Sequence, residues 1–138
     1  MSKPTTAQTE IRSFPFAMEC HLPAVAGEWF FTDERVWIRE RLNHASEPLV
    51  SIADARLEPG VTTQLHRLRG IRERYVITTG TGRMLVGNRE FSVLAGDVVV
   101  IDADESQRIT NTGMDELCFE CVCTPRFVPE SYESLEEN

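Results

Sequence analysis

The sequence predicts an all-β domain, built as a sandwich or barrel with a jelly roll as its simplest arrangement. Short runs rich in β-branched and aromatic residues alternate with turns containing Gly, Pro, Asn or Asp. Their regular spacing is typical of sandwiches and barrels. No segment shows a convincing helical period. A jelly roll is expected because it protects the edges of many short strands.

Each expected strand lies between residues that favour turns. Residues 29–41 mix aromatic and β-branched residues with charges, as a strand with one exposed face does. The turns are marked by four Gly-containing sequences: Pro59-Gly60, Gly80-Thr81-Gly82, Gly87-Asn88 and Ala95-Gly96-Asp97. The expected strands are residues 29–41, 49–58, 62–68, 73–79, 83–87, 89–94, 98–102, 107–111 and 117–123. Residues 130–137 would form a short turn.

Length and charge suggest one domain and exclude some classes of partner. The 138 residues fit a single domain with a core. We expect an N-terminal arm at 1–27, a barrel at 28–127 and an acidic C-terminal tail, exposed to solvent, at 128–138. A net charge of −8 argues against a nucleic-acid binder, which needs a basic surface. The chain shows no apolar run long enough for a membrane and no signal peptide, so we expect a cytoplasmic protein without a membrane partner.

The cysteines are expected to be reduced. The chain has Cys20, Cys118, Cys121 and Cys123, and the last three lie in the apolar run LCFECVC. A zinc knuckle would need a second pair of ligands at suitable spacing, which Cys20 alone does not supply. Small strand hydrophobes are therefore the expected role of these thiols.

Two spaced motifs carry the chemistry of the chain. The first is Gly60-x5-His66-x-Leu68-x4-Glu73-x6-Gly80, and the second is Gly96-x5-Asp102-x-Asp104-x2-Gln107-x3-Asn111. Both spacings resemble the signature motifs of the cupin superfamily. The resemblance implies a double-stranded β-helix, the jelly-roll cupin barrel. That family usually has His-x-His and Glu in the first motif and a third His in the second; here Leu68 and Gln107 stand at two of the histidine positions.

A finer resemblance covers roughly residues 30–132. The chain is similar to a bacterial branch of small single-domain cupins that has HRL in the first motif and Gln in the second. The runs that carry it are ERVWIRERLN (34–43), TTQLHRL (62–68), ERYVI (73–77), GDVVVID (96–102), QRITN (107–111) and CTPRF (123–127). Members of this branch are mostly described only as cupin-domain proteins, so the resemblance implies no specific activity.

Strand alternation groups the candidate site residues. Residues two apart in a strand share a face, so His66 shares its face with Gln64 and Leu68, while Arg67 and Arg69 take the other. The resemblance implies that the His66, Glu73 and Gln107 faces point into the barrel. The expected inner cluster is Gln64, His66, Glu73, Tyr75 and Gln107, beside Leu68, Ile77 and Ile109.

This cluster favours a small-molecule pocket with a degenerate metal site. Transition metals prefer imidazole and carboxylate ligands, and only His66 and Glu73 are strong candidates, with Gln107 as a neutral third ligand. We therefore expect either no cofactor or a weakly bound divalent transition metal. The predicted ligand-binding residues are Gln64, His66, Glu73, Gln107 and Arg126, where the Arg126 guanidinium would clamp a carboxylate or phosphate.

An enzyme is the alternative. A metal-dependent dioxygenase or isomerase would use His66 and Glu73. A metal-free isomerase, epimerase or cyclase, resembling cupin sugar-nucleotide epimerases, would use His66 as base and Tyr75 as acid. Each residue also has a structural interpretation: His66 as a satisfied core histidine, Tyr75 as a core aromatic, and Arg126 as a guanidinium bonded to backbone carbonyls.

A homodimer is predicted from a cluster of four arginines, Arg67, Arg69, Arg72 and Arg74. Like charges this close repel unless they have partners. One interpretation is that solvent screens them or that they pair with Asp33, Glu34 and Glu40 of the N-terminal strands. The other is a dimer interface, since the cupins that the chain resembles often exchange N-terminal strands between subunits. Light scattering at micromolar concentration should give twice the monomer mass of 15.7 kDa. A monomer at high concentration would contradict this prediction.

Overall fold

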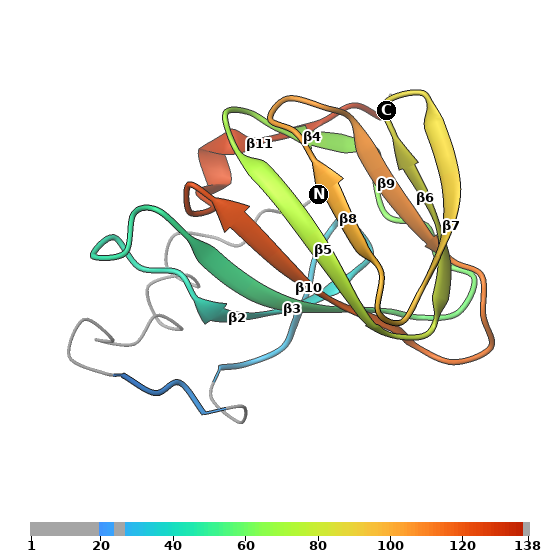
Figure 1. Cartoon of the computed structure of the whole chain (residues 1–138), viewed down its shortest axis with the longest axis horizontal. Helices are drawn as coiled ribbons and strands as arrows, with labels where there is room; N and C mark the ends of the chain where they lie inside the picture. Colours follow the sequence, from blue (N-terminus) through green and yellow to red (C-terminus); the bar gives the residue numbers. More distant parts are fainter. Residues whose placement is uncertain (1–19, 24–26, 137–138) are drawn as a thin grey trace.

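The computed structural model describes residues 20–23 and 27–136, which form two antiparallel sheets (Figure 1). In these residues the six-stranded sheet contains, in spatial order, β1 (Phe30–Phe31), β2 (Trp37–Leu42), β3 (Ser51–Leu57), β10 (Leu117–Thr124), β5 (Arg72–Thr79) and β8 (Val98–Ile101). The five-stranded sheet contains β11 (Tyr132–Ser134), β4 (His66–Leu68), β9 (Gln107–Asn111), β6 (Thr81–Val86) and β7 (Arg89–Leu94). The prediction of an all-β jelly roll is confirmed.

The core lies between the two sheets, and both contribute to it. Leu57, Ile77 and Leu117 come from the six-stranded sheet, while Met84 and Ile109 come from the other, and all are at most 1% exposed. They belong to one continuous cluster, as expected when alternate side chains of each strand face a partner sheet. The central position of β10, between β3 and β5, brings distant parts of the chain into register.

The N-terminal run expected as one strand contains two. β1 and β2 are separated by a turn in which the Arg35 amide donates to the Thr32 carbonyl, and the Thr32 amide and hydroxyl both donate to the Val36 carbonyl. Arg35 adopts φ of 75°, a left-handed conformation that reverses the chain. The two strands then pair antiparallel. This turn also carries Glu34 to the barrel interior.

The segment expected as a solvent-exposed tail forms part of the barrel wall. After a short 3-10 helix, η2 (Pro129–Ser131), β11 pairs antiparallel with β4, so the expected boundary at 127 is corrected to include it. Glu133 receives hydrogen bonds from Arg67 at 2.7 Å and Arg69 at 3.0 Å. A charge run read from sequence gives no hint of such pairing. The predicted N-terminal arm, 1–27, lies mostly outside the described residues.

The arginine cluster finds partners other than those predicted. Arg67 and Arg69 bind Glu133, and Arg72 lies 3.2 Å from Asp102. Arg74 donates to Thr124. The predicted pairing with Glu34 and Glu40 is wrong, because both side chains are buried inside the barrel. The homodimer stays a prediction, without the support that these arginines lent it.

The cysteines and the helices of the described residues can be compared with the expectations from the sequence. All four cysteines are free thiols: Cys20, Cys118, Cys121 and Cys123. Among the described residues, no helix has the length and apolar character needed to cross a membrane.

We predict that Leu117→Ala lowers the free energy of unfolding by about 2–5 kcal/mol, because it leaves a cavity at a fully buried site between the sheets. Leu49→Ala is the matched control, since Leu49 is 75% exposed and should change stability by at most about 0.5 kcal/mol. Urea unfolding followed by tryptophan fluorescence measures both. Equal effects for the two variants would contradict this account of the core.

Candidate functional site

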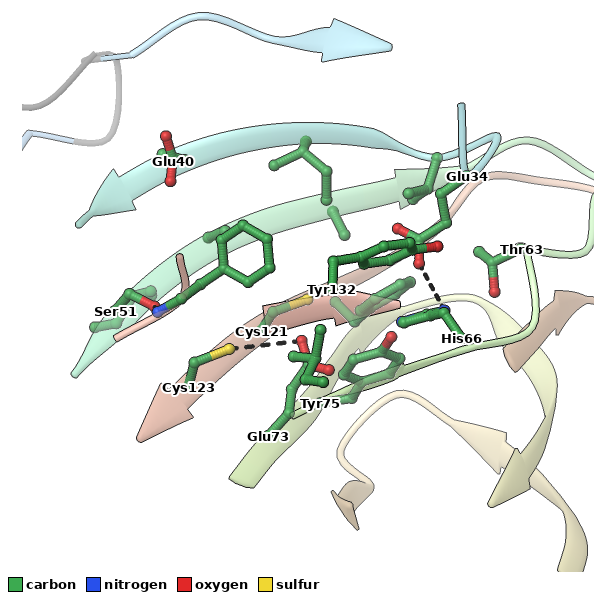
Figure 2. A pocket seen from close by; sticks show the side chains of 18 residues that line it. Glu34, Glu40, Ser51, Thr63, His66, Glu73, Tyr75, Cys121, Cys123 and Tyr132 are labelled. Atoms are coloured by element: carbon green, nitrogen blue, oxygen red, sulfur yellow. Dashed lines mark hydrogen bonds and ion pairs between the residues drawn. The ribbon is translucent and has the colours of Figure 1, made fainter. Parts of the chain in front are cut away.

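A cavity of about 70 Å³ lies inside the barrel (Figure 2). Strands β2, β3, β4, β5 and β10 contribute to its wall, together with residues near both ends of the described chain. Its apolar lining includes Ile38, Ala53, Leu68 and Phe119. Its polar and sulfur-bearing lining consists of Glu34, Glu40, Ser51, Thr63, His66, Glu73, Tyr75, Cys121, Cys123 and Tyr132. A largely apolar cavity with a few convergent polar groups is the usual form of a small-molecule site.

His66 is held in one orientation by two acceptors. Its Nδ1 lies 2.7 Å from the Gln64 carbonyl oxygen and 3.0 Å from the Glu34 carboxylate. Because both partners accept, Nδ1 carries a hydrogen, and Nε2 is left as the ring nitrogen for a ligand. Burial alone would lower the pKa of His66, but the charge and hydrogen bond of Glu34, together with the Gln64 carbonyl and the charge of Glu73, raise the pKa above the ordinary value of 6.5.

A chain of hydrogen bonds fixes Glu73 on β5. The Tyr75 hydroxyl donates to Gln107 Oε1 at 2.8 Å, and Gln107 Nε2 donates to Glu73 Oε1 at 3.0 Å. The Cys123 thiol lies 3.8 Å from the other Glu73 oxygen. Burial raises the pKa of Glu73, and it raises those of Tyr75 and Cys123 well above their ordinary values. The tyrosine and the thiol are therefore neutral donors.

The structure brings most of the predicted cluster together. His66, Glu73 and Tyr75 line the cavity, with Leu68 beside them. Gln107 is buried but stands behind the lining, where its amide connects Tyr75 to Glu73. His66, Glu73 and Tyr75 therefore share one cavity, and Gln107 is bonded to two of them.

Two predicted ligand-binding residues lie outside the cavity lining. β4 begins at His66, so strand alternation does not extend back to Gln64, whose side chain instead accepts a hydrogen bond from Tyr132. Thr63 lines the cavity in its place. Arg126 donates to the Asn43 side chain at 2.8 Å, which gives its guanidinium a structural partner. Neither Gln64 nor Arg126 therefore occupies the position that the sequence predicts.

Most of the lining residues come from outside the two motifs, and among them are Glu34, Glu40 and Tyr132. Glu40 shares its face of β2 with Ile38, so strand alternation was a signal available in the sequence for Glu40. Glu34 lies in the turn before β2, where alternation does not apply. Tyr132 stacks on His66, with ring centroids 4.8 Å apart. No pattern in the sequence signals this stacking, because it depends on the return of β11 to β4.

The donor set does not fit a tightly held transition metal. Leu68 offers no donor atom, and the Gln107 amide is already bonded to Tyr75 and Glu73. His66 has Nδ1 bonded to Glu34 and a carbonyl, so it could supply a single donor, Nε2. Within the described part of the chain, no three His, Cys, Asp or Glu side chains gather closely enough to hold a metal ion. We therefore derive no chemistry through a metal.

Comparison with known proteins gives two sequence relatives. An uncharacterized protein of Methanocaldococcus jannaschii is 34% identical over 86 residues, which are 62% of this chain and 69% of that protein. An oxalate-binding protein of Thermotoga maritima is 37% identical over 70 residues, which are 51% of this chain and 58% of that protein. No family model matches the chain.

Solved structures share the fold. A protein of Thermotoga maritima described as a predicted oxalate decarboxylase is 27% identical, with a TM-score of 0.66, over 76% of this chain and 96% of its own. The cupin domain of Cnp3 from Schizosaccharomyces pombe is 13% identical, with a TM-score of 0.62, over 76% and 72% of the two chains. The second likeness is evidence of a common fold alone.

We predict that Glu34→Gln lowers the pKa of His66, because it removes the charge that opposes the effect of burial. NMR of the imidazole nitrogens should show the native ring protonated to a pH above 6.5 and the variant ring losing its proton at lower pH. Since the folded pKa is raised, the stability that the pair contributes is present below pH 6.5 and is lost as pH rises through the folded pKa. Glu58→Gln, at an exposed position, is the control. If the His66 ring loses its proton at the same pH in the native protein and in Glu34→Gln, Glu34 does not raise the pKa of His66.

Proposed function

The chain belongs to the cupin superfamily, and from that premise we propose that it binds a small molecule inside its barrel. The observation that supports this function is the cavity inside the barrel, with the Glu34–His66 pair at one place on its wall and Glu73 at another. Apolar side chains such as Phe119 would exclude water from the bound molecule. The hydrogen bonds that fix His66 and Glu73 hold these groups ready for a ligand, which reduces the entropic cost of binding.

Oxalate, which the name of one relative gives as its ligand, is a poor match for this cavity. Oxalate is a dianion, and an anion in a buried site needs positive charges or many hydrogen-bond donors. Among the described residues that line the cavity, the basic side chains amount to His66 alone, and this ring is already paired with Glu34. We therefore do not carry oxalate over to this chain.

Ligand-observed NMR against a mixed library of small acids, polyols, amines and aromatics tests the proposal. Ala53→Leu adds bulk to the cavity wall, whereas Ala103→Leu makes the same chemical change in an exposed loop. Compounds that bind the native protein should bind Ala103→Leu equally and Ala53→Leu at least about tenfold more weakly. Thermal melting verifies that both variants fold. The proposal would be contradicted if no compound in the library bound, or if the compounds bound Ala53→Leu as tightly as the native protein.

A metal-free enzyme is the second candidate, and the fixed orientation of His66 favours it. Because Nδ1–H is bonded to Glu34 and a carbonyl, Nε2 of the neutral ring, the form present above its raised pKa, is positioned to accept a proton from a bound molecule. Tyr75 is less suited to return that proton, since its hydroxyl donates to Gln107. The enzyme is established if the native protein and Glu58→Gln chemically convert a bound compound and His66→Gln does not. Binding without conversion would leave the protein a binder.

We predict that Leu68→His together with Gln107→His raises the affinity for a divalent transition metal at least about tenfold. The two replacements supply imidazole donors at the positions where cupins usually have them. Isothermal titration with nickel compares the double variant with the native chain, and Leu49→His serves as a control for a histidine added at the surface. The prediction of weak metal binding is wrong if the native protein purifies with one metal ion per chain and His66→Ala purifies without it.

A further inference from the structure

A second hollow lies on the outer face of the five-stranded sheet, where β9, β6 and β7 run side by side (Figure 1). Its volume is about 380 Å³, which falls in the usual range for small-molecule pockets. Met84 and Ile109 of these strands are buried in the core, so their neighbours along the chain face outward, away from the interior cavity. The three strands contribute to the lining of this outer hollow Arg83, Leu85, Glu90, Arg108 and Thr110.

The charge of the outer hollow is opposite to that of the protein. Three arginines and two glutamates line it, so its formal charge is +1, whereas the whole chain carries −8. One of the glutamates, Glu136, lies 3.1 Å from Arg35 and accepts the Leu65 amide at 2.9 Å. This ion pair is neutral as a unit, so the positive charge comes from the arginines of β6 and β9. A local positive charge on an acidic protein attracts anions to that place.

Strand register places the two remaining arginines close together. On β6, Arg83 lies opposite Thr110 of β9, and the next outward residue, Leu85, lies opposite Arg108. Arg83 and Arg108 are therefore diagonal neighbours, a separation that long side chains can span. Arg83 uses one nitrogen to donate to Ser92 at 3.2 Å. Within the described part of the chain, no hydrogen bond or ion pair engages the Arg108 guanidinium. Most N–H groups of the two arginines are thus available to a ligand.

A hydroxyl hydrogen adds a further donor. The Thr62 and Thr110 hydroxyl oxygens lie 2.8 Å apart, and either can donate to the other. Two hydroxyl groups joined by one hydrogen bond keep one hydrogen for a third group. Both threonines line the outer hollow, and Thr110 lies opposite Arg83, so this hydrogen is on the same side as the arginines. Three separate donor groups suit a tetrahedral oxyanion better than a carboxylate, which has only two oxygens.

We propose that the outer hollow binds the phosphate group of a small phosphorylated molecule, with Arg83 and Arg108 as its anchors. Guanidinium groups bind phosphate through paired, charge-assisted hydrogen bonds. The hollow is larger than a single phosphate ion, so it has room for the organic part, which Leu85 contacts. Glu90, opposite Leu85 on β7, weakens phosphate binding through its negative charge. This site is distinct from the interior cavity, with which it shares no lining residue.

Titration of inorganic phosphate into isotope-labelled protein, followed by NMR, tests the proposal. Sodium chloride at equal ionic strength controls for screening, and acetate controls for a carboxylate. Phosphate should shift the Nε–H signals of Arg83 and Arg108 saturably at millimolar concentration, and acetate should bind more weakly. Arg108→Gln should weaken phosphate binding about threefold to fivefold, and Glu90→Gln should strengthen it about twofold. Arg72→Gln, at an exposed position in the other sheet, should leave phosphate binding unchanged.

The control measurements distinguish this site from a general effect of charge. The proposal is overturned if phosphate shifts no signal, if chloride produces the same shifts, or if Arg108→Gln and Arg72→Gln weaken phosphate equally. Acetate binding as tightly as phosphate overturns the assignment of phosphate as the bound group. Ala53→Leu alters only the interior cavity, so loss of phosphate binding in this variant, when folded, overturns the outer site. The amide NMR spectrum of each variant verifies its fold.

Discussion

The constraint on which this barrel depends is the need to satisfy carboxylates buried between its sheets. Each such group would destabilise the fold if it lacked partners. Glu34 meets the His66 ring, and Glu73 meets the Gln107 amide, which Tyr75 orients in turn. These bonds join strands from both sheets, so the groups that stabilise the interior also define the shape and charge of the cavity.

The C-terminal segment connects this interior to the surface. Glu136 accepts a hydrogen bond from the Leu65 amide, next to His66, and binds Arg35, next to Glu34. Tyr132 stacks on the His66 ring from the same segment. One short stretch of chain therefore supports both partners of the buried ion pair, although neither Glu136 nor Tyr132 belongs to a recognisable motif. The exposed ion pairs contribute modestly, and the strand pairing carries the attachment.

The cavity also illustrates how a shared scaffold acquires a different chemistry. Leu68 and Gln107 stand where the usual motifs place histidines, so the site loses donors for a metal and gains an apolar wall and an amide bridge. Two glutamates from the N-terminal strand and turn then set the charge of the interior. Fold alone does not assign function, because the side chains that face the ligand decide it.

The sequence by itself determined most of the strands and which side chains share a face, because turn residues and two-residue alternation are local properties, and the resemblance to cupins implied that the faces of His66 and Glu73 point inward. Glu40 shares its face of β2 with Ile38, whereas the turn before β2 brings Glu34 inside. Only the tertiary structure decided that Gln64 and Arg126 lie off the cavity wall and that Tyr132 covers His66. Those positions depend on where β4 begins and on how β11 returns to pair with it. Contacts between residues so distant in the chain arise from the packing of the whole barrel, which no local pattern encodes.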